Sequence, residues 1–294
     1  DEGVDRVPCQ RSLPMIFPGD AAEETEGLSE SAEDIHKMQE KYSGRIPGAN
    51  LHYKDAVELV TEGASEVCLV VEQDVMACRS RNVVARIEGT DKKDEILTIT
   101  AHYDSVPEGP GAYDNMAGAA IIMELCRYFQ QYRPRRTMEF VWFGAEEKGL
   151  LGSRDYIRVH ESELGAHRFN MNVDLAGQLI GGNVLGVTGE ASVCDKLLEI
   201  ADGAGIGASV KNQIWGSDSN SFAWKGIPAM TLNRDGFGMH TRYDTIDLLS
   251  AWSLERSAIL LGCIADALGN AEVFPFERKM PEKFIGELDE YMCR

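Results

Sequence analysis

Five side chains that can bind a metal ion follow segments with the pattern of β-strands, three of them directly and two at the end of a loop. They are His102, Asp114, Glu147, Asp174 and His240. Functional groups of open α/β sheets gather beyond the carboxyl ends of the strands, so we expect these five side chains on one rim of a sheet. Two imidazoles and three carboxylates form a donor set that Zn²⁺ accepts.

A shared carboxylate would give each of two ions three protein ligands and leave positions open for water, as hydrolysis at a two-metal site requires. The neighbouring carboxylates of Glu146 and Glu147 cannot both point the same way from a strand end. If Glu147 binds metal, Glu146 faces the open side of the site. A carboxylate beside the reacting water is the natural general base, and we assign this role to Glu146.

The elements that must position these residues alternate between strands and helices. Strand-like segments cover residues 82–87, 95–100, 137–143, 169–175, 183–187, 209–214 and 227–232. Helical patterns cover residues 115–131, 146–160, 191–203, 219–225 and 253–268. The alternation predicts a three-layer α/β/α fold, in which a central mixed, mostly parallel sheet has helices on both faces.

The composition excludes several other classes of protein. The chain has 294 residues, and 29 basic against 48 acidic side chains give a net charge of −19. Bulk nucleic-acid binding and docking on an anionic membrane both need basic side chains, so neither is expected. No run of about 18 uncharged apolar residues is present, and we therefore expect no membrane span.

The seven cysteines are odd in number and form no CxxC pair. This excludes a zinc ribbon and a dense disulfide framework, and it favours a reducing, cytoplasmic location. A single bridge such as Cys68–Cys78 stays open. The first residue is Asp1 rather than Met, which leaves a processed, secreted protein open as well.

The motifs around the five residues resemble the co-catalytic dizinc aminopeptidases, a family that includes bacterial leucyl aminopeptidases and is related to glutamate carboxypeptidases and glutaminyl cyclases. The matching motifs are AHYDS (101–105), GAYDNMAG (111–118), FVWFGAEEKGLLGS (140–153), NMNVDLAG (170–177), SDSNSFAWKGIPAMTL (217–232) and HTRYDT (240–245). The resemblance covers roughly residues 81–270 in order and spacing.

The resemblance implies a function and a role for each motif residue. Asp114 resembles the carboxylate that bridges two zinc ions, with Glu147 and His240 completing one site and His102 and Asp174 the other. The implied reaction is hydrolysis of the first peptide bond of a peptide with a free N-terminus.

Further implications concern neighbouring residues. Glu146 would be the general base, and Asp104 resembles the acid that orients an imidazole or the metal site. The peptide bond after the bridging residue is commonly cis in this family, which implies a cis bond between Asp114 and Asn115.

The resemblance also divides the chain. Residues 81–294 would form the zinc-peptidase domain, and residues 1–80 an accessory segment. Within this segment, residues 46–71 resemble the closing part of a protease-associated insertion, and residues 20–40 carry eight acids against one base, typical of a solvated helix face or mobile arm. A short helix at 55–61 and a strand at 66–72 are also expected.

The sequence departs from the family at one position and leaves alternatives open. Some relatives have a tyrosine directly before the last ligand histidine, where this chain has Met239. A carboxypeptidase or aminoacylase would use the same fold and need a basic residue for the substrate carboxylate, for which Arg234, Arg242 and Lys225 are candidates. A one-zinc glutaminyl cyclase and a non-catalytic binding ectodomain are further alternatives.

Overall fold

The computed structural model describes residues 52–66, 68 and 79–292, and it divides the chain into two compact units, 1–80 and 81–294. In the first unit, α2 (Tyr53–Thr61) begins after His52, whose Nδ1 accepts a hydrogen bond from the Lys54 N–H at 3.3 Å. This helix matches the one expected at 55–61. The acidic stretch, most of the expected strand and most of the insertion-like segment lie outside the described residues.

The second unit is built on a sheet of seven strands in the order β1-β3-β2-β4-β7-β5-β6. The strands are β1 (Val83–Ile87), β2 (Lys92–His102), β3 (Arg136–Phe143), β4 (His167–Val173), β5 (Asn183–Thr188), β6 (Ala208–Lys211) and β7 (Ala229–Arg234). The four central strands are parallel, β1 runs antiparallel to β3, and β5 runs antiparallel to β7. The prediction of a mixed, mostly parallel sheet is confirmed.

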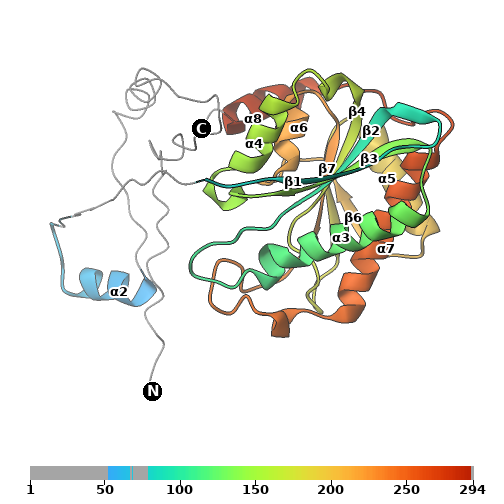
Figure 1. Ribbon diagram of the computed structural model, residues 1–294. Coiled ribbons are helices and arrows are strands. Elements are labelled where there is room, and N and C mark those ends of the chain that lie inside the picture. The colour runs from blue at the N-terminus through green and yellow to red at the C-terminus, as the bar shows by residue number, and fades with distance from the viewer. Residues whose placement is uncertain (1–51, 67, 69–78, 293–294) are drawn as a thin grey trace. The chain divides into compact units, whose positions relative to one another are not determined.

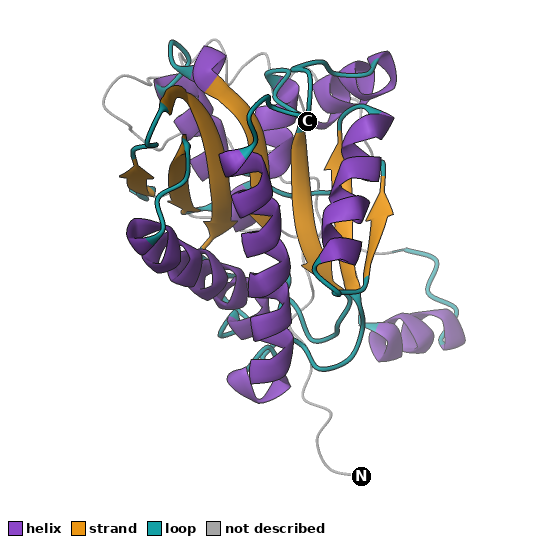
Figure 2. Ribbon diagram, turned by 90° about the vertical axis from the view of Figure 1, so that its right-hand side faces the viewer, coloured by secondary structure: helices purple, strands orange, loops and turns teal. Residues whose placement is uncertain are grey.

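Helices cover both faces of the sheet, as Figures 1 and 2 show. They are α3 (Ala117–Gln131), α4 (Leu151–Val159), α5 (Ala191–Gly203), α6 (Ser219–Trp224), α7 (Ala251–Asn270) and α8 (Glu282–Met292). Helices α3, α5 and α7 pack together on one face, and α4, α6 and α8 pack on the other. This arrangement is the expected three-layer fold.

The central strands form the core and also align the functional edge. Side chains such as Leu97, Ile99 and Phe140 have no exposed surface, and burial of apolar area contributes roughly 25 cal/mol per Å² to the stability of this layer. In the β2–β3 pairing His102 is opposite Phe143, and in the β2–β4 pairing Thr100 is opposite Asn172. The residues that follow these strands therefore emerge at the same edge.

The structure departs from the expected helices at two functional segments. The helix expected at 146–160 is broken into a 3-10 turn at Glu146–Lys148 and the later α4, with Gly149 and Leu150 in the left-handed region at φ 101° and 63°. The helix expected from residue 115 starts with a distorted turn at Ala112–Met116 before α3. Helix α8 was not predicted at all.

Two further findings concern the sequence-based exclusions. Of the helices in the described part of the chain, none has the length and apolar character needed to cross a membrane. Among the described residues Cys68, Cys126, Cys194 and Cys263 are free thiols, whereas Cys78, the other half of the bridge left open above, lies outside them.

Candidate metal centre

Asp114 lies between two imidazoles, one on each side of its carboxylate. Its Oδ1 is 3.2 Å from Nε2 of His102, and its Oδ2 is 3.1 Å from Nε2 of His240. His102 ends β2, whereas Asp114 lies in the turn that precedes α3, and His240 lies in the loop after β7. One carboxylate therefore faces two ring nitrogens from residues that lie far apart in the sequence.

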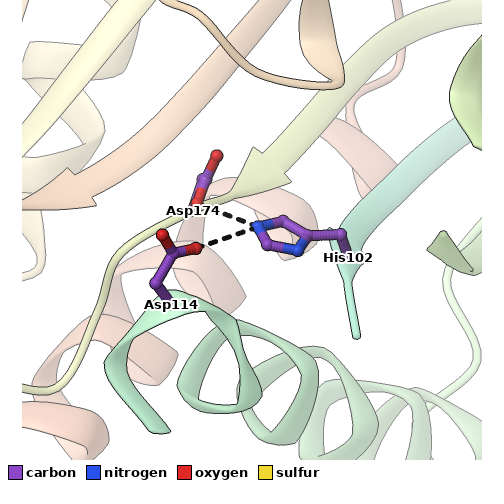
Figure 3. Close-up of side chains that lie close together, drawn as sticks. All are labelled: His102, Asp114 and Asp174. Carbon is purple, nitrogen blue, oxygen red and sulfur yellow. Dashed lines mark hydrogen bonds and ion pairs between the residues drawn. The ribbon is translucent and has the colours of Figure 1, made fainter. Parts of the chain in front are cut away.

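A second carboxylate accompanies each imidazole. Asp174, just past β4, places Oδ1 3.3 Å from His102 Nε2, and Figure 3 shows it converging on His102 with Asp114. Glu147 places Oε2 3.0 Å from His240 Nε2. The donor atoms of each of these two triads lie within 4.8 Å of one another. All five predicted metal-binding residues are thus brought together. They form two triads, and Asp114 belongs to both.

The two predicted catalytic carboxylates lie beside this cluster. Glu146 Oε2 is 4.0 Å from His102 Nε2, so its side chain turns toward one imidazole while that of Glu147 turns toward the other. Asp104 accepts hydrogen bonds from the backbone N–H groups of Glu146 at 3.0 Å and Glu147 at 3.2 Å. Its backbone oxygen is 3.2 Å from His102 Nδ1. Asp104 therefore orients both the carboxylate turn and one ring.

The backbone takes uncommon conformations at these residues. Ala145, Leu175 and His240 have φ values of 58°, 68° and 58°, in the left-handed region that side chains with a Cβ rarely adopt. Ala145 directly precedes Glu146, and Leu175 directly follows Asp174. His240 is itself a member of the cluster. Such conformations cluster at functional sites because the surrounding fold must enforce them. The peptide bond between Asp114 and Asn115 is cis, as the resemblance implied.

Sequence reasoning missed a layer of supporting side chains. The buried carboxylate of Asp244 accepts hydrogen bonds from the backbone N–H groups of Tyr113 at 2.6 Å and Asp114 at 3.0 Å. The Ser217 hydroxyl donates to Asp174 Oδ2 at 2.6 Å. Asp244 lies in the motif HTRYDT and Ser217 in the motif SDSNS, both of which carry the family resemblance. Membership in these motifs was the signal that could have identified the two residues.

The cluster favours positive charge at its centre. Hydrogen bonds with Asp114 and Glu147 raise the pKa of His240 to about 10. Burial opposes the charged form of His102, but the charge of Asp174 and contacts with Asp104 and Asp114 raise its pKa well above its usual value. Burial likewise disfavours ionised Asp114, yet the two imidazoles hold its pKa at about 2.

Glu146 differs from the other carboxylates of the cluster. Burial, together with the charges of Asp174, Asp218 and Glu147, raises its pKa well above the usual range for glutamate, although His102 acts in the opposite direction. For Asp104, the hydrogen bonds with His102 and the Glu146 N–H outweigh burial and lower the pKa. A raised pKa suits a group that must take up and release a proton near neutral pH.

The residues fit a pair of metal ions by their geometry and their unsatisfied atoms. Glu147 Oε1 is buried and has no hydrogen-bond partner among the described residues, a costly state for a carboxylate oxygen unless it serves as a ligand. The donor atoms of His102, Asp114 and Asp174, and those of Asp114, Glu147 and His240, lie within 4.8 Å of one another in each triad, and the first triad is buried. This donor set is typical of zinc and related metals.

A mixed sheet between two layers of helices, with a shared-carboxylate cluster at its strand ends, defines the chain as an α/β protein with a candidate metal centre. The comparisons with known proteins then give the family. The sequence model of peptidase family M28 matches residues 82–262, and the chain belongs to this family.

Three relatives illustrate the match. Aminopeptidase YwaD of Bacillus subtilis (strain 168) is 30% identical over 161 residues, covering 54% of this chain and 32% of that protein. Carboxypeptidase Q of Rattus norvegicus is 26% identical over 241 residues, covering 78% and 51%. The structure of the zinc aminopeptidase BSAP from Bacillus subtilis has a TM-score of 0.60 at 26% identity, covering 68% of this chain and 53% of that one. The chain spans about half of these relatives or less.

Proposed function

We propose that this protein is a zinc-dependent aminopeptidase that holds two zinc ions and hydrolyses the first peptide bond of peptides with a free N-terminus. The observation that carries the proposal is the carboxylate of Asp114 between His102 and His240, with one oxygen at 3.2 Å and the other at 3.1 Å. Asp174 would complete the first zinc site, and Glu147 the second. The similarity to the aminopeptidases YwaD and BSAP supports the same function.

Zinc ions bound there would lower the pKa of water and polarise the carbonyl group of the substrate. The remaining chemistry belongs to side chains of this protein. Glu146 accepts the proton of the attacking water and returns it to the leaving amine, which its raised pKa suits. Asp104 holds the turn that carries Glu146 and keeps the His102 ring in its orientation.

The surroundings favour attack from the N-terminus over attack from the C-terminus. Arg234 is buried and donates to the backbone oxygens of Gln178 and Leu179, so it is engaged in the fold. Lys225 pairs with Glu161 at 3.6 Å. Two of the three basic candidates for binding a substrate carboxylate therefore already have partners within the protein. A net charge of −19 also favours a substrate with a cationic α-ammonium group.

The test compares leucine p-nitroanilide with its N-acetylated form, N-acetyl-leucine and a peptide with a blocked N-terminus, alongside zinc analysis by mass spectrometry. We expect turnover of the free amine only, two zinc ions per chain, and loss of turnover on chelation. Hydrolysis of the N-acylated amino acid with no action on the free-amine amide would replace the proposal with the carboxypeptidase or aminoacylase alternative.

A further inference from the structure

Helix α8 lies beyond the residues that match the family model, yet it is fastened to the elements that build the site. Phe284 and Leu288 are buried in a cluster with Ala223 of α6 and Ala229 of β7. Figure 1 shows α8 beside α6 and α4. This apolar face fixes the helix against the layer that includes α6.

Polar contacts fix the end of the same helix. The Trp224 indole N–H donates to Asp289 Oδ1 at 2.9 Å, and Arg154 Nη2 donates to the backbone oxygen of Met292 at 2.6 Å. Because Arg154 belongs to α4, the last turn of α8 is held from two sides. A side chain in this turn is therefore held at a defined position.

Tyr291 stands in this last turn and is half-buried. Its hydroxyl oxygen would lie 3.1 Å from a methyl group placed on Gly216, so the glycine leaves the space that the phenol enters. Gly216 directly precedes Ser217, whose hydroxyl donates to Asp174. The phenol thus reaches the loop that supports one side of the candidate metal centre.

The phenol of Tyr291 is available as a hydrogen-bond donor. Within the described part of the chain its hydroxyl has no hydrogen-bond partner. Burial and the negative charges of Glu146, Asp218 and Asp174 raise its pKa, so the hydroxyl keeps its proton at neutral pH.

Other tyrosines around the cluster are engaged or exposed. The Tyr103 hydroxyl donates to the backbone oxygen of Arg81 at 2.7 Å, and the Tyr113 hydroxyl donates to that of Arg234. Tyr243 is 59% exposed, and its oxygen accepts a hydrogen bond from Arg242. Met239, directly before His240, has no proton to donate. Tyr291 is therefore the best placed phenol for a substrate.

We propose that Tyr291 contacts the substrate and donates a hydrogen bond to the carbonyl oxygen of the scissile bond, an inference that rests on the proposed aminopeptidase function. Hydrolysis of an amide moves negative charge onto this oxygen in the transition state. A fixed donor aimed at the oxygen stabilises that charge, and loss of one such donor typically lowers kcat about 10²–10³-fold.

The test is Tyr291→Phe in the zinc-loaded 294-residue chain, assayed on leucine p-nitroanilide. We expect kcat to fall about 10²-fold with KM nearly unchanged, because the hydrogen bond strengthens only as charge develops. Zinc content and the melting temperature should match the wild type. Tyr132→Phe, which removes an exposed hydroxyl at the end of α3, is the matched control and should leave both constants unchanged.

Inhibitor binding separates a substrate contact from a structural role. A boronic acid analogue, which forms a tetrahedral adduct, should lose about 10²-fold in affinity for the phenylalanine variant, whereas the product leucine should bind as before. Gly216→Ala should also lower kcat, and this loss should shrink when Tyr291 is already phenylalanine, because both changes act on the same hydroxyl.

Each remaining outcome has a distinct meaning. If the wild-type chain with two zinc ions does not hydrolyse the free-amine amide, the proposed function fails. If the wild type is active and Tyr291→Phe retains its kcat, or changes KM alone, the inference about Tyr291 is overturned while the aminopeptidase function stands. An equal loss of affinity for leucine and for the boronic acid would also overturn it.

Discussion

A buried carboxylate in the sheet, Glu139, and the carboxylates of the strand-end cluster are stabilised in opposite ways. Glu139, in the middle of β3, is 1% exposed and pairs with Arg86 of β1 through Oε2 while its Oε1 accepts a hydrogen bond from the Tyr156 hydroxyl. Both of its oxygens therefore have a protein donor. At the strand ends, by contrast, Asp114 faces only imidazoles, and one oxygen of Glu147 has no partner among the described residues.

The difference separates a carboxylate that supports the fold from carboxylates that, under the proposed function, bind metal. Burial of a charge is costly unless hydrogen bonds and opposite charge compensate for it. Arg86 and Tyr156 provide this compensation inside the protein, so Glu139 needs nothing further. Among the described residues, no lysine or arginine pairs with the strand-end cluster, which therefore depends on protonated imidazoles or on bound metal. Substitutions at Asp114 and Glu146 disturb the strand-end cluster, and a substitution at Arg86 disturbs the surroundings of Glu139.

The largest effect is expected for Asp114→Asn, which keeps the shape of the bridging side chain and removes its charge. Both metal sites lose a ligand, so zinc content should fall below one ion per chain, and turnover should be lost with it. Zinc analysis of purified protein measures the first result, and the leucine p-nitroanilide assay measures the second.

The control for Asp114→Asn is Asp202→Asn, which makes the same chemical change at an exposed position of α5. This variant should keep two zinc ions and full turnover. Retention of two zinc ions by Asp114→Asn would contradict the bridging role and would leave two independent sites as the alternative.

Glu146→Gln should abolish the proton transfer and leave the metal centre intact. We expect kcat to fall about 10²–10⁴-fold, the usual contribution of a general base, with zinc content unchanged. Loss of zinc together with activity would show that Glu146 is a ligand, and the roles of Glu146 and Glu147 would then be exchanged.

Arg86→Met tests the other group by leaving Glu139 buried without its cation. Breaking a buried ion pair typically costs about 3–5 kcal/mol, and because Arg86 is 43% exposed we expect the lower end, about 3 kcal/mol, in denaturant unfolding. Zinc content should not change. The control is Arg127→Met, which removes an exposed pair with Glu124 on α3 and should cost less than about 0.5 kcal/mol. Equal losses for the two variants would contradict the comparison.

The sheet and the cluster residues could be predicted because buried parallel strands leave a plain signal. The apolar run at 137–143 has no polar alternation, so the polar residues Glu146 and Glu147 that follow it stand out. The same contrast marks His102 at the end of β2 and Asp174 directly after β4. The order of strands and the register that aligns these residues are consistent with the sequence but cannot be read from it.

The turns and the supporting contacts could not be predicted, because they depend on distant parts of the chain. Asp244 fixes the backbone of Asp114 across 130 residues of sequence. The left-handed Leu150 breaks a helical pattern that looks continuous locally. Helix α8 has buried apolar residues four apart at Phe284, Leu288 and Met292, a usable signal, but nothing in this spacing places Tyr291 beside Gly216.

The smallest effect is expected for His167, through the pH dependence of the free energy of unfolding. It tests whether the region around Glu139 differs from the strand-end cluster in holding a neutral histidine. This ring is fully buried near Glu139, its Nδ1 is 2.6 Å from the Thr98 hydroxyl, and burial lowers its pKa to about 4. An unfolded histidine has a pKa of about 6.5, so between these values the unfolded chain binds more protons than the native state. The stability that depends on neutral His167 is present above pH 6.5 and lost as pH falls toward 4, by about 3 kcal/mol in total.

The measurement is denaturant unfolding of the chelated protein at pH 7 and at pH 4, for the wild type and for His167→Gln. The strand-end cluster is the same in both proteins, so its own pH dependence cancels in the difference between them. The wild type should lose about 2–3 kcal/mol more than the variant on acidification, because glutamine cannot take up a proton. Parallel losses would show that the buried imidazole is already protonated beside Glu139, and the two regions would then both depend on charged histidine.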